Sequence, residues 1–197
     1  LTGKTITLEV EASDTIQKQG ISFIGRISEA KGALILEDII SKIGDVPISI
    51  VGSGAYLEQL REYVDTIKAK NVTFFGKVDS TTVYDVIQKS ICVVMPSQFA
   101  ESHPLVAIES MACRTPVIGS DLAGLGEILK KSGGGIAIDP PDNVDGYVKA
   151  IKRLIASPDM AEKLGEHGKS FVQNNLQMKH TTQQLIDIYR EVINEHN

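Results

Sequence analysis

Two carboxylates of this 197-residue chain are spaced in a way that could serve binding chemistry. Glu101 and Glu109 have seven residues between them, inside a stretch from Cys92 to Asp121 that runs as an apolar segment, a polar loop, a helix and a second apolar segment. Pro104 suits the first helical position, so Glu101 is predicted in the loop and Glu109 in the second turn. The unpaired N–H groups of the first turn then lie between them, ready for an anion.

A carboxylate repels a phosphate, so the two glutamates are predicted to accept hydroxyl protons. A sugar diphosphate that carries a ribose offers hydroxyls on both sides of its phosphates. This assignment gives Glu101 and Glu109 binding roles and removes them as an acid–base pair. The alternative is an ordinary helix whose early glutamate favours the helix dipole, with no ligand at all.

Two cations lie in the loop from Gly25 to Gly32, after an apolar run and before a helical pattern. Arg26 and Lys31 at the end of a strand could clamp a phosphate or a diphosphate, and the helix N-terminus would add backbone donors. Taken alone, the loop favours the simpler alternative of two solvated surface charges. The segment 52–54, Gly-Ser-Gly, also follows a strand pattern, but it lacks a third glycine and is explained by a tight turn.

Short apolar runs alternate with helical patterns along most of the chain, which predicts an α/β fold with right-handed βαβ units. The runs are apolar throughout, as expected for strands covered on both faces. We predict a Rossmann-like, doubly wound parallel sheet of about six strands followed by C-terminal helices, with ligands beyond the carboxyl ends of the strands. The predicted strands are 21–24, 47–51, 72–75, 91–95, 116–119 and 135–138, and the predicted helices are 33–43, 55–69, 80–89, 143–156, a short one from 158, and 181–195.

Composition excludes several classes of protein. The hydrophobic fraction of 42% and the charged fraction of 23% are ordinary for a globular domain. The net charge of −5 argues against a general nucleic-acid binder. The two cysteines form no disulfide framework or metal-ligand pattern, which favours a reducing compartment. The sequence shows neither a signal peptide nor a membrane-spanning run, so we expect a cytoplasmic protein.

The first residues have a different character. The sequence LTGKTITLEVEASDTI closely resembles part of the first hairpin of ubiquitin and the start of its helix. We therefore expect residues 1–20 to be a ubiquitin-like leader, an engineered fusion or linker piece, and residues 21–197 to be the functional domain. The alternative is a chance strand that adds to the edge of a sheet.

Four motifs of the remaining chain resemble one family. They are F-I-G-R-x4-K-G from Phe23, V-G-S-G from Val51, V-x-F-x-G-x-V from Val72 and P-S-x3-E-S-x-P-L-V-x-I-E-x-M-A-C-x-T-P-V-I from Pro96. Their order and spacing resemble the C-terminal, donor-binding domain of the retaining glycosyltransferases of group 1 (family 4 type), which have the two-domain GT-B architecture. The resemblance covers essentially all of residues 21–197 and implies one half of a GT-B fold.

The resemblance implies roles for individual residues. Glu101 would contact the donor sugar, Glu109 the nucleotide ribose, and Arg26 and Lys31 the diphosphate, so that Glu101, Arg26 and Lys31 form the catalytic set. It implies no obligatory metal. The family often has small residues where His103 and Pro104 stand, and proline has no N–H to offer the sugar. Further donor-binding residues implied are Gly25, Val78 near the base, Ser102, His103, Leu105 and Val106.

The same resemblance implies a nucleotide diphosphate sugar such as a UDP- or GDP-hexose as substrate, with no cofactor. The acceptor would bind against an N-terminal domain that this chain lacks, so the chain is expected to bind donor but transfer sugar poorly. The full enzyme would be cytoplasmic or peripheral at the inner membrane, and the last helix could promote self-association of the fragment. Two alternatives stay open: a nucleotide-sugar epimerase, and a non-catalytic binding or engineered module.

Overall fold

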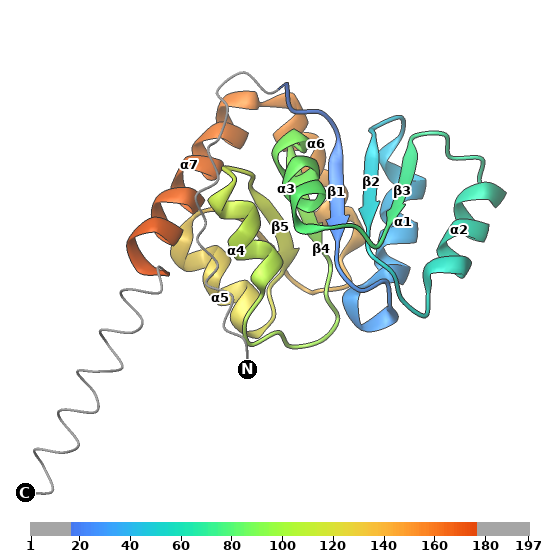
Figure 1. The fold of residues 1–197 in the computed structure, drawn as a ribbon, viewed down its shortest axis with the longest axis horizontal. Helices are drawn as coiled ribbons and strands as arrows, with labels where there is room; N and C mark the ends of the chain where they lie inside the picture. The colour runs from blue at the N-terminus through green and yellow to red at the C-terminus, as the bar shows by residue number, and fades with distance from the viewer. Residues whose placement is uncertain (1–16, 177–197) are drawn as a thin grey trace, which may run out of the picture.

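A single six-stranded parallel sheet forms the centre of the computed structural model, which describes residues 17–176 (Figure 1). The strands are in the order β3-β2-β1-β4-β5-β6, and every neighbouring pair is parallel. The chain therefore runs from β1 through β2 to β3 at one edge of the sheet. It then returns to place β4 beside β1 and continues through β5 to β6 at the other edge. Strand bounds are β1 Ile21–Ile24, β2 Ile48–Val51, β3 Val72–Gly76, β4 Cys92–Met95, β5 Val117–Ser120 and β6 Gly135–Ile138.

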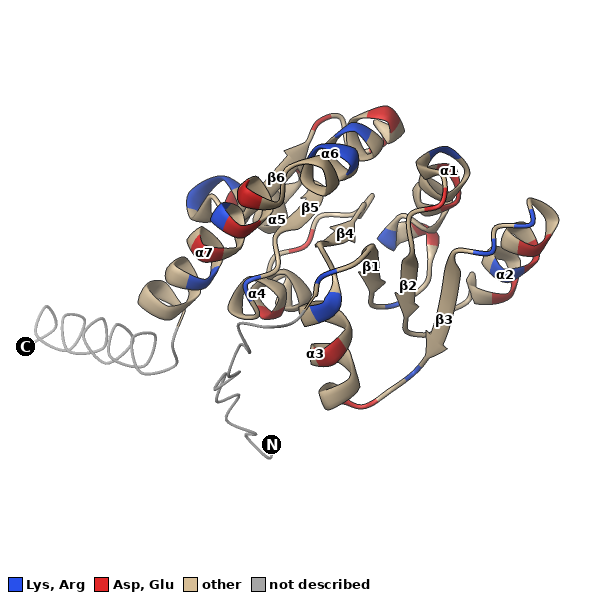
Figure 2. Ribbon diagram, turned by 90° about the horizontal axis from the view of Figure 1, so that it is seen from above, with Lys and Arg blue, Asp and Glu red and all other residues tan. Residues whose placement is uncertain are grey.

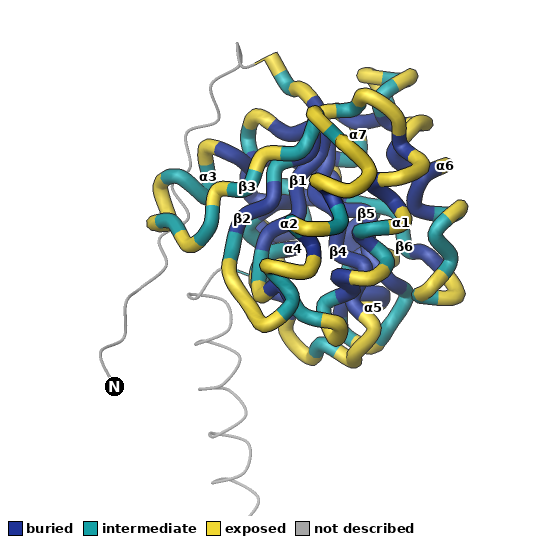
Figure 3. The backbone as a smooth tube through the Cα atoms, turned by 90° about the vertical axis from the view of Figure 1, so that its right-hand side faces the viewer, coloured by how far each residue is buried: buried dark blue, intermediate teal, exposed yellow. Residues whose placement is uncertain are grey.

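Helices cover both faces of the sheet, and each face has its own apolar core. Successive strand residues point to opposite faces: Phe23 packs into one core and Ile24 into the other. The first core contains α1 (Ala33–Ile43), α2 (Leu57–Thr66) and α6 (Val144–Ala156). The second contains α3 (Ser80–Lys89), α4 (Leu105–Ala112) and α5 (Ala123–Ser132), and α7 (Pro158–Asn175) contributes to both. The four central strands, β2, β1, β4 and β5, are consequently almost entirely buried, whereas the edge strand β3 has no fully buried residue (Figure 3).

The fold class predicted from the sequence is confirmed: a parallel, Rossmann-like sheet of six strands with helices on both faces. Each predicted strand lies within one residue of its observed bounds. Helix α5 was not predicted, and neither was the short 3-10 helix η1 (Glu29–Lys31). The N-cap of α3 is Asp79, whose side chain accepts a hydrogen bond from the amide of Thr82. The predicted helix 181–195 lies outside the described residues.

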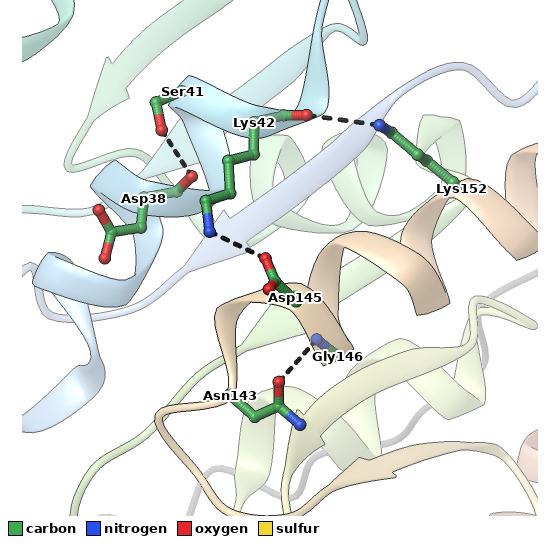
Figure 4. A network of polar contacts seen from close by, with 7 residues as sticks. All are labelled: Asp38, Ser41, Lys42, Asn143, Asp145, Gly146 and Lys152. Carbon is green, nitrogen blue, oxygen red and sulfur yellow. Dashed lines mark hydrogen bonds and ion pairs between the residues drawn. The ribbon is translucent and has the colours of Figure 1, made fainter.

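Polar contacts join α1 to α6, two helices more than a hundred residues apart in sequence (Figure 4). The amine of Lys42 is 2.8 Å from Oδ1 of Asp145, and Lys152 donates to the backbone carbonyl of Lys42 at 3.4 Å. Asn143 caps α6 by accepting from the amide of Gly146 at 2.9 Å. These contacts fix the last turn of α1 over the same face of the sheet as α6. Charges of both signs are interspersed over the outer helices (Figure 2).

The segment just before β1 is packed against the domain. Lys18 donates to the backbone carbonyl of Arg114 at 2.7 Å and to Oγ1 of Thr115 at 2.9 Å. The amide of Gln19 donates to the carbonyl of Lys89 at 2.7 Å. Residues 18–20, which we assigned to the leader, thus have specific contacts with the sheet and its helices, while residues 1–16 lie outside the described part of the chain.

Candidate functional site

The loops after β1 and β4 meet at the carboxyl edge of the sheet. β1 is paired with β2 on one side and β4 on the other, so the direction of the strand order reverses between β1 and β4. Doubly wound sheets bind ligands in the crevice at this switch point. A cavity of about 260 Å³ lies there. It is lined by Phe23, Ile24, Gly25, Arg26, Lys31, Met95, Ser97, Glu101, His103, Leu105 and Val106.

An ion pair bridges the two loops across this cavity. The amine of Lys31, from η1, lies 2.8 Å from Oε1 of Glu101, in the loop after β4. The same oxygen accepts a hydrogen bond from the hydroxyl of Ser97. The Glu101 side chain is only 14% exposed, whereas that of Lys31 is 38% exposed. The carboxylate is thus held in place from two sides at the wall of the cavity, and the more exposed cation faces solvent.

Close backbone approach holds these loops together. Gly32 has φ 81°, and a Cβ there would lie 1.9 Å from the carbonyl oxygen of Pro96. The amide of Gln98 donates to the carbonyl of Ala30 at 2.9 Å. The glycines of segment 52–54 serve the same purpose, since a Cβ on Gly52 would lie 1.8 Å from the oxygen of Gly25. This supports the tight-turn explanation of that segment, and none of its residues lines the cavity.

Helix α4 presents its N-terminus to the cavity. Pro104 is the N-cap of α4, whereas the sequence predicted it at the first helical position. The carbonyl of Pro104 accepts hydrogen bonds from the amides of Ala107 and Ile108 at 3.0 and 3.2 Å. The amide of Leu105 is already engaged, because it donates to the carbonyl of His103 at 2.9 Å. The positive end of the helix dipole therefore faces the cavity and favours an anion there.

Glu109 lies in the second turn of α4, as predicted, but it does not line the cavity. Burial raises the pKa of its carboxyl group, and hydrogen bonding from the Tyr84 hydroxyl on α3 opposes that rise. The pKa of Tyr84 is raised in turn by burial and by the charge of Glu109. A half-buried carboxylate with a phenol beside it is suited to hydroxyl partners more than to a cation in solvent.

The structure brings together most of the residues predicted for the site. Seven of them line the cavity: Gly25, Arg26, Lys31, Glu101, His103, Leu105 and Val106. Three do not. Ser102 is exposed and its carbonyl packs near Gly124, Val78 packs against the core on the α3 side of the sheet, and Glu109 faces Tyr84. Which of them touch a ligand stays a prediction.

Sequence reasoning missed Ser97, the hydrogen-bond partner of Glu101. The signal was a serine that directly follows the strand β4 and Pro96, four residues before the glutamate. In the part of the chain that the structure describes, no group of three or more His, Cys, Asp or Glu side chains could hold a metal ion. Among the same residues, no helix is both long and apolar enough to cross a membrane.

A second hollow of about 500 Å³ lies between the ends of α1 and α2. Its lining includes Ile40, Gly44, Lys68, Lys70 and Asn71. It shares no residue with the cavity at the switch point, and none of the residues predicted for the site lies in it.

The fold is a doubly wound α/β domain, and its cavity at the switch point is lined by two cations and the N-terminus of a helix. The family follows from comparison with known proteins. Residues 12–171 match the model of the glycosyl transferases group 1, and the chain belongs to that family.

Relatives and solved structures agree with this assignment. An uncharacterized glycosyltransferase of Methanocaldococcus jannaschii is 30% identical over 149 residues, which are 76% of this chain and 42% of the relative. The sucrose-phosphate synthase of Thermosynechococcus elongatus superposes with a TM-score of 0.79 at 29% identity, covering 90% of this chain and 46% of that one. Anabaena HepE, solved in complex with UDP-glucose, gives a TM-score of 0.78 at 18% identity over 88% of this chain and 49% of that one. The chain therefore spans about half the length of the proteins it matches.

Proposed function

We propose that this chain is the donor-binding half of a retaining glycosyltransferase, which transfers a hexose from a nucleoside diphosphate sugar to an acceptor. The observation that carries the proposal is the Lys31–Glu101 ion pair across the switch point. It places a partly exposed cation and a carboxylate on the wall of one cavity. The group 1 family match and the UDP-glucose complex of a protein with this fold support a nucleotide sugar as the ligand.

The diphosphate would bind between the β1 loop and the N-terminus of α4. Arg26 and Lys31 both line the cavity and supply two positive charges. The helix dipole adds a favourable field at the same place. When the bond between the sugar and the diphosphate breaks, negative charge develops on the leaving oxygen, and fixed positive groups stabilise it without an obligatory metal.

Glu101 would orient the sugar, and Glu109 would accept hydroxyl protons of the ribose. Glu101 is suited to this because Lys31 and Ser97 both engage Oε1. Fixing the sugar relative to its leaving group is a proximity effect that raises the rate of transfer. The acceptor would enter from the side of an N-terminal domain, and transfer with retained configuration would need that domain to close over the cavity.

We also propose that residues 1–20 are a ubiquitin-like leader joined to the domain, with residues 18–20 packed against it. The full enzyme would act in the cytoplasm or at the inner membrane surface.

Titration calorimetry tests the proposal. The chain is titrated with UDP, GDP and ADP and with their hexose conjugates, with inorganic phosphate as a control for simple anion binding. We expect one of the three nucleoside diphosphates to bind with clear preference over phosphate. A folded sample that binds none of them would overturn the donor-domain function.

A further inference from the structure

Ser97 is a buried hydroxyl whose side-chain partner is the central carboxylate of the cavity. It is 2% exposed and donates to Oε1 of Glu101. The amine of Lys31 is 2.8 Å from the same oxygen. Among contacts between described residues, the other carboxylate oxygen, Oε2, has no protein partner. One oxygen is therefore held by the protein, and the other is left for a ligand.

The two partners of Oε1 differ in how a ligand would affect them. Lys31 is 38% exposed and lines the cavity, so a diphosphate in the cavity competes with Glu101 for its amine. Ser97 also lines the cavity, but its side chain is neutral and the residue is only 2% exposed, so a diphosphate does not draw it away from Glu101. Its backbone is fixed on both sides, by the packing of Gly32 against Pro96 and by the hydrogen bond from Gln98 to Ala30.

We propose that Ser97 is the positioning residue that keeps Glu101 oriented toward the donor sugar once the diphosphate has engaged Lys31. This rests on the proposed function, in which Glu101 contacts the sugar. Ser97 acts through Glu101 and touches no reacting atom. Its contribution should therefore concern the sugar and leave the nucleoside diphosphate unaffected.

The test compares Kd values for UDP and UDP-glucose, or for the guanosine or adenosine pair if the wild type prefers it. Ser97→Ala should raise Kd for the nucleotide sugar by about 3- to 10-fold, the usual effect of one hydrogen bond, and leave Kd for the nucleoside diphosphate unchanged. Ser97→Cys restores the size of the side chain with only a weak donor, so it should behave like Ser97→Ala. Ser90→Ala is the matched control, because Ser90 is 3% exposed and donates to the backbone carbonyl of Val86.

A double-mutant cycle with Glu101→Ala separates positioning from packing. If Ser97 acts through Glu101, adding Ser97→Ala to Glu101→Ala changes Kd for the nucleotide sugar no further. Equal weakening of both ligands by Ser97→Ala, recovery in Ser97→Cys, or additive effects in the cycle would overturn the role of Ser97. A wild type that binds no nucleoside diphosphate would instead overturn the proposed function, so the two failures are distinguishable.

Discussion

Replacing Lys31 by alanine should weaken nucleoside diphosphate binding by about 10- to 30-fold. A unit charge about 4 Å from an opposite charge gains about 4 kcal/mol at an effective dielectric constant of about 20. The Lys31 side chain is 38% exposed, so solvent screening reduces this, and measured exposed pairs contribute about 0.2–1 kcal/mol. We take about 1.4–2 kcal/mol, between these limits, which corresponds to the stated loss of affinity.

The same substitution leaves Glu101 without its cation. The Glu101 carboxylate, 14% exposed, would then face the diphosphate without Lys31 between them. The double variant Lys31→Ala with Glu101→Gln should therefore bind the nucleoside diphosphate more tightly than Lys31→Ala alone. Raising the salt concentration should weaken wild-type binding more than binding by either variant, because the lost attraction is electrostatic.

Calorimetry of the wild type and three variants provides the measurement. Lys42→Ala is the matched control: its ion pair with Asp145 has the same 2.8 Å separation, and it lies about 14 Å along α1 from the first residue of that helix. Lys42→Ala should leave Kd unchanged. Equal losses for Lys31→Ala and Lys42→Ala, or no loss for Lys31→Ala, would refute the role given to Lys31.

Three further predictions concern other parts of the domain. Glu109→Ala should weaken nucleotide binding more than Lys89→Ala. The affinity of the wild type should also fall on acidification as Glu109 becomes protonated, and this fall should begin at a higher pH than for an exposed glutamate because burial raises the pKa of Glu109. A pH-independent Kd would contradict this prediction. Gly32→Ala should lower the free energy of unfolding by several kcal/mol more than Gly133→Ala. Both glycines have a left-handed φ, but a Cβ at Gly32 would lie 1.9 Å from a carbonyl oxygen, whereas a Cβ at Gly133 would lie 3.3 Å from a side-chain nitrogen. Equal denaturation midpoints for the two variants would count against this prediction. Burial lowers the pKa of Lys18 from 10.5 to about 8, so between these pH values the unfolded chain holds a proton on Lys18 that the folded chain has lost. The free energy of unfolding should therefore rise with pH across this window by on the order of 3 kcal/mol. Urea titrations at several pH values should show this rise in the wild type and not in Lys18→Met.

The sequence predicts the sheet well because each strand is a short apolar run followed by a polar loop. It misses α5 for a physical reason. That helix contains Gly124 and Gly126, and glycine lowers helix propensity by about 1 kcal/mol relative to alanine. The tertiary contacts require these glycines: a Cβ on Gly124 would lie 2.6 Å from the carbonyl oxygens of Glu101 and Ser102. The close packing of α5 against the site loop thus requires glycine, which weakens the helical pattern of this segment in the sequence.

The sequence predicted which residues of the candidate site meet at one edge of the sheet. It did not predict the side-chain contacts among them. Parallel strands place the loops after β1 and β4 together, so Arg26, Lys31 and Glu101 were expected to be neighbours. The direct Lys31–Glu101 pair and its third partner, Ser97, depend on side-chain geometry between segments some seventy residues apart, which spacing alone does not determine.

The location of the donor site is tested by amide chemical shifts of the labelled chain, followed during titration with UDP-glucose or the preferred nucleotide sugar. We expect changes concentrated at Gly25, Arg26, Lys31, Glu101, His103, Leu105 and Val106, which line the cavity at the switch point. We expect none at Lys68 to Asn71, which line the second hollow. Changes centred on that hollow, or none anywhere in a folded sample, would contradict a donor site between β1 and β4.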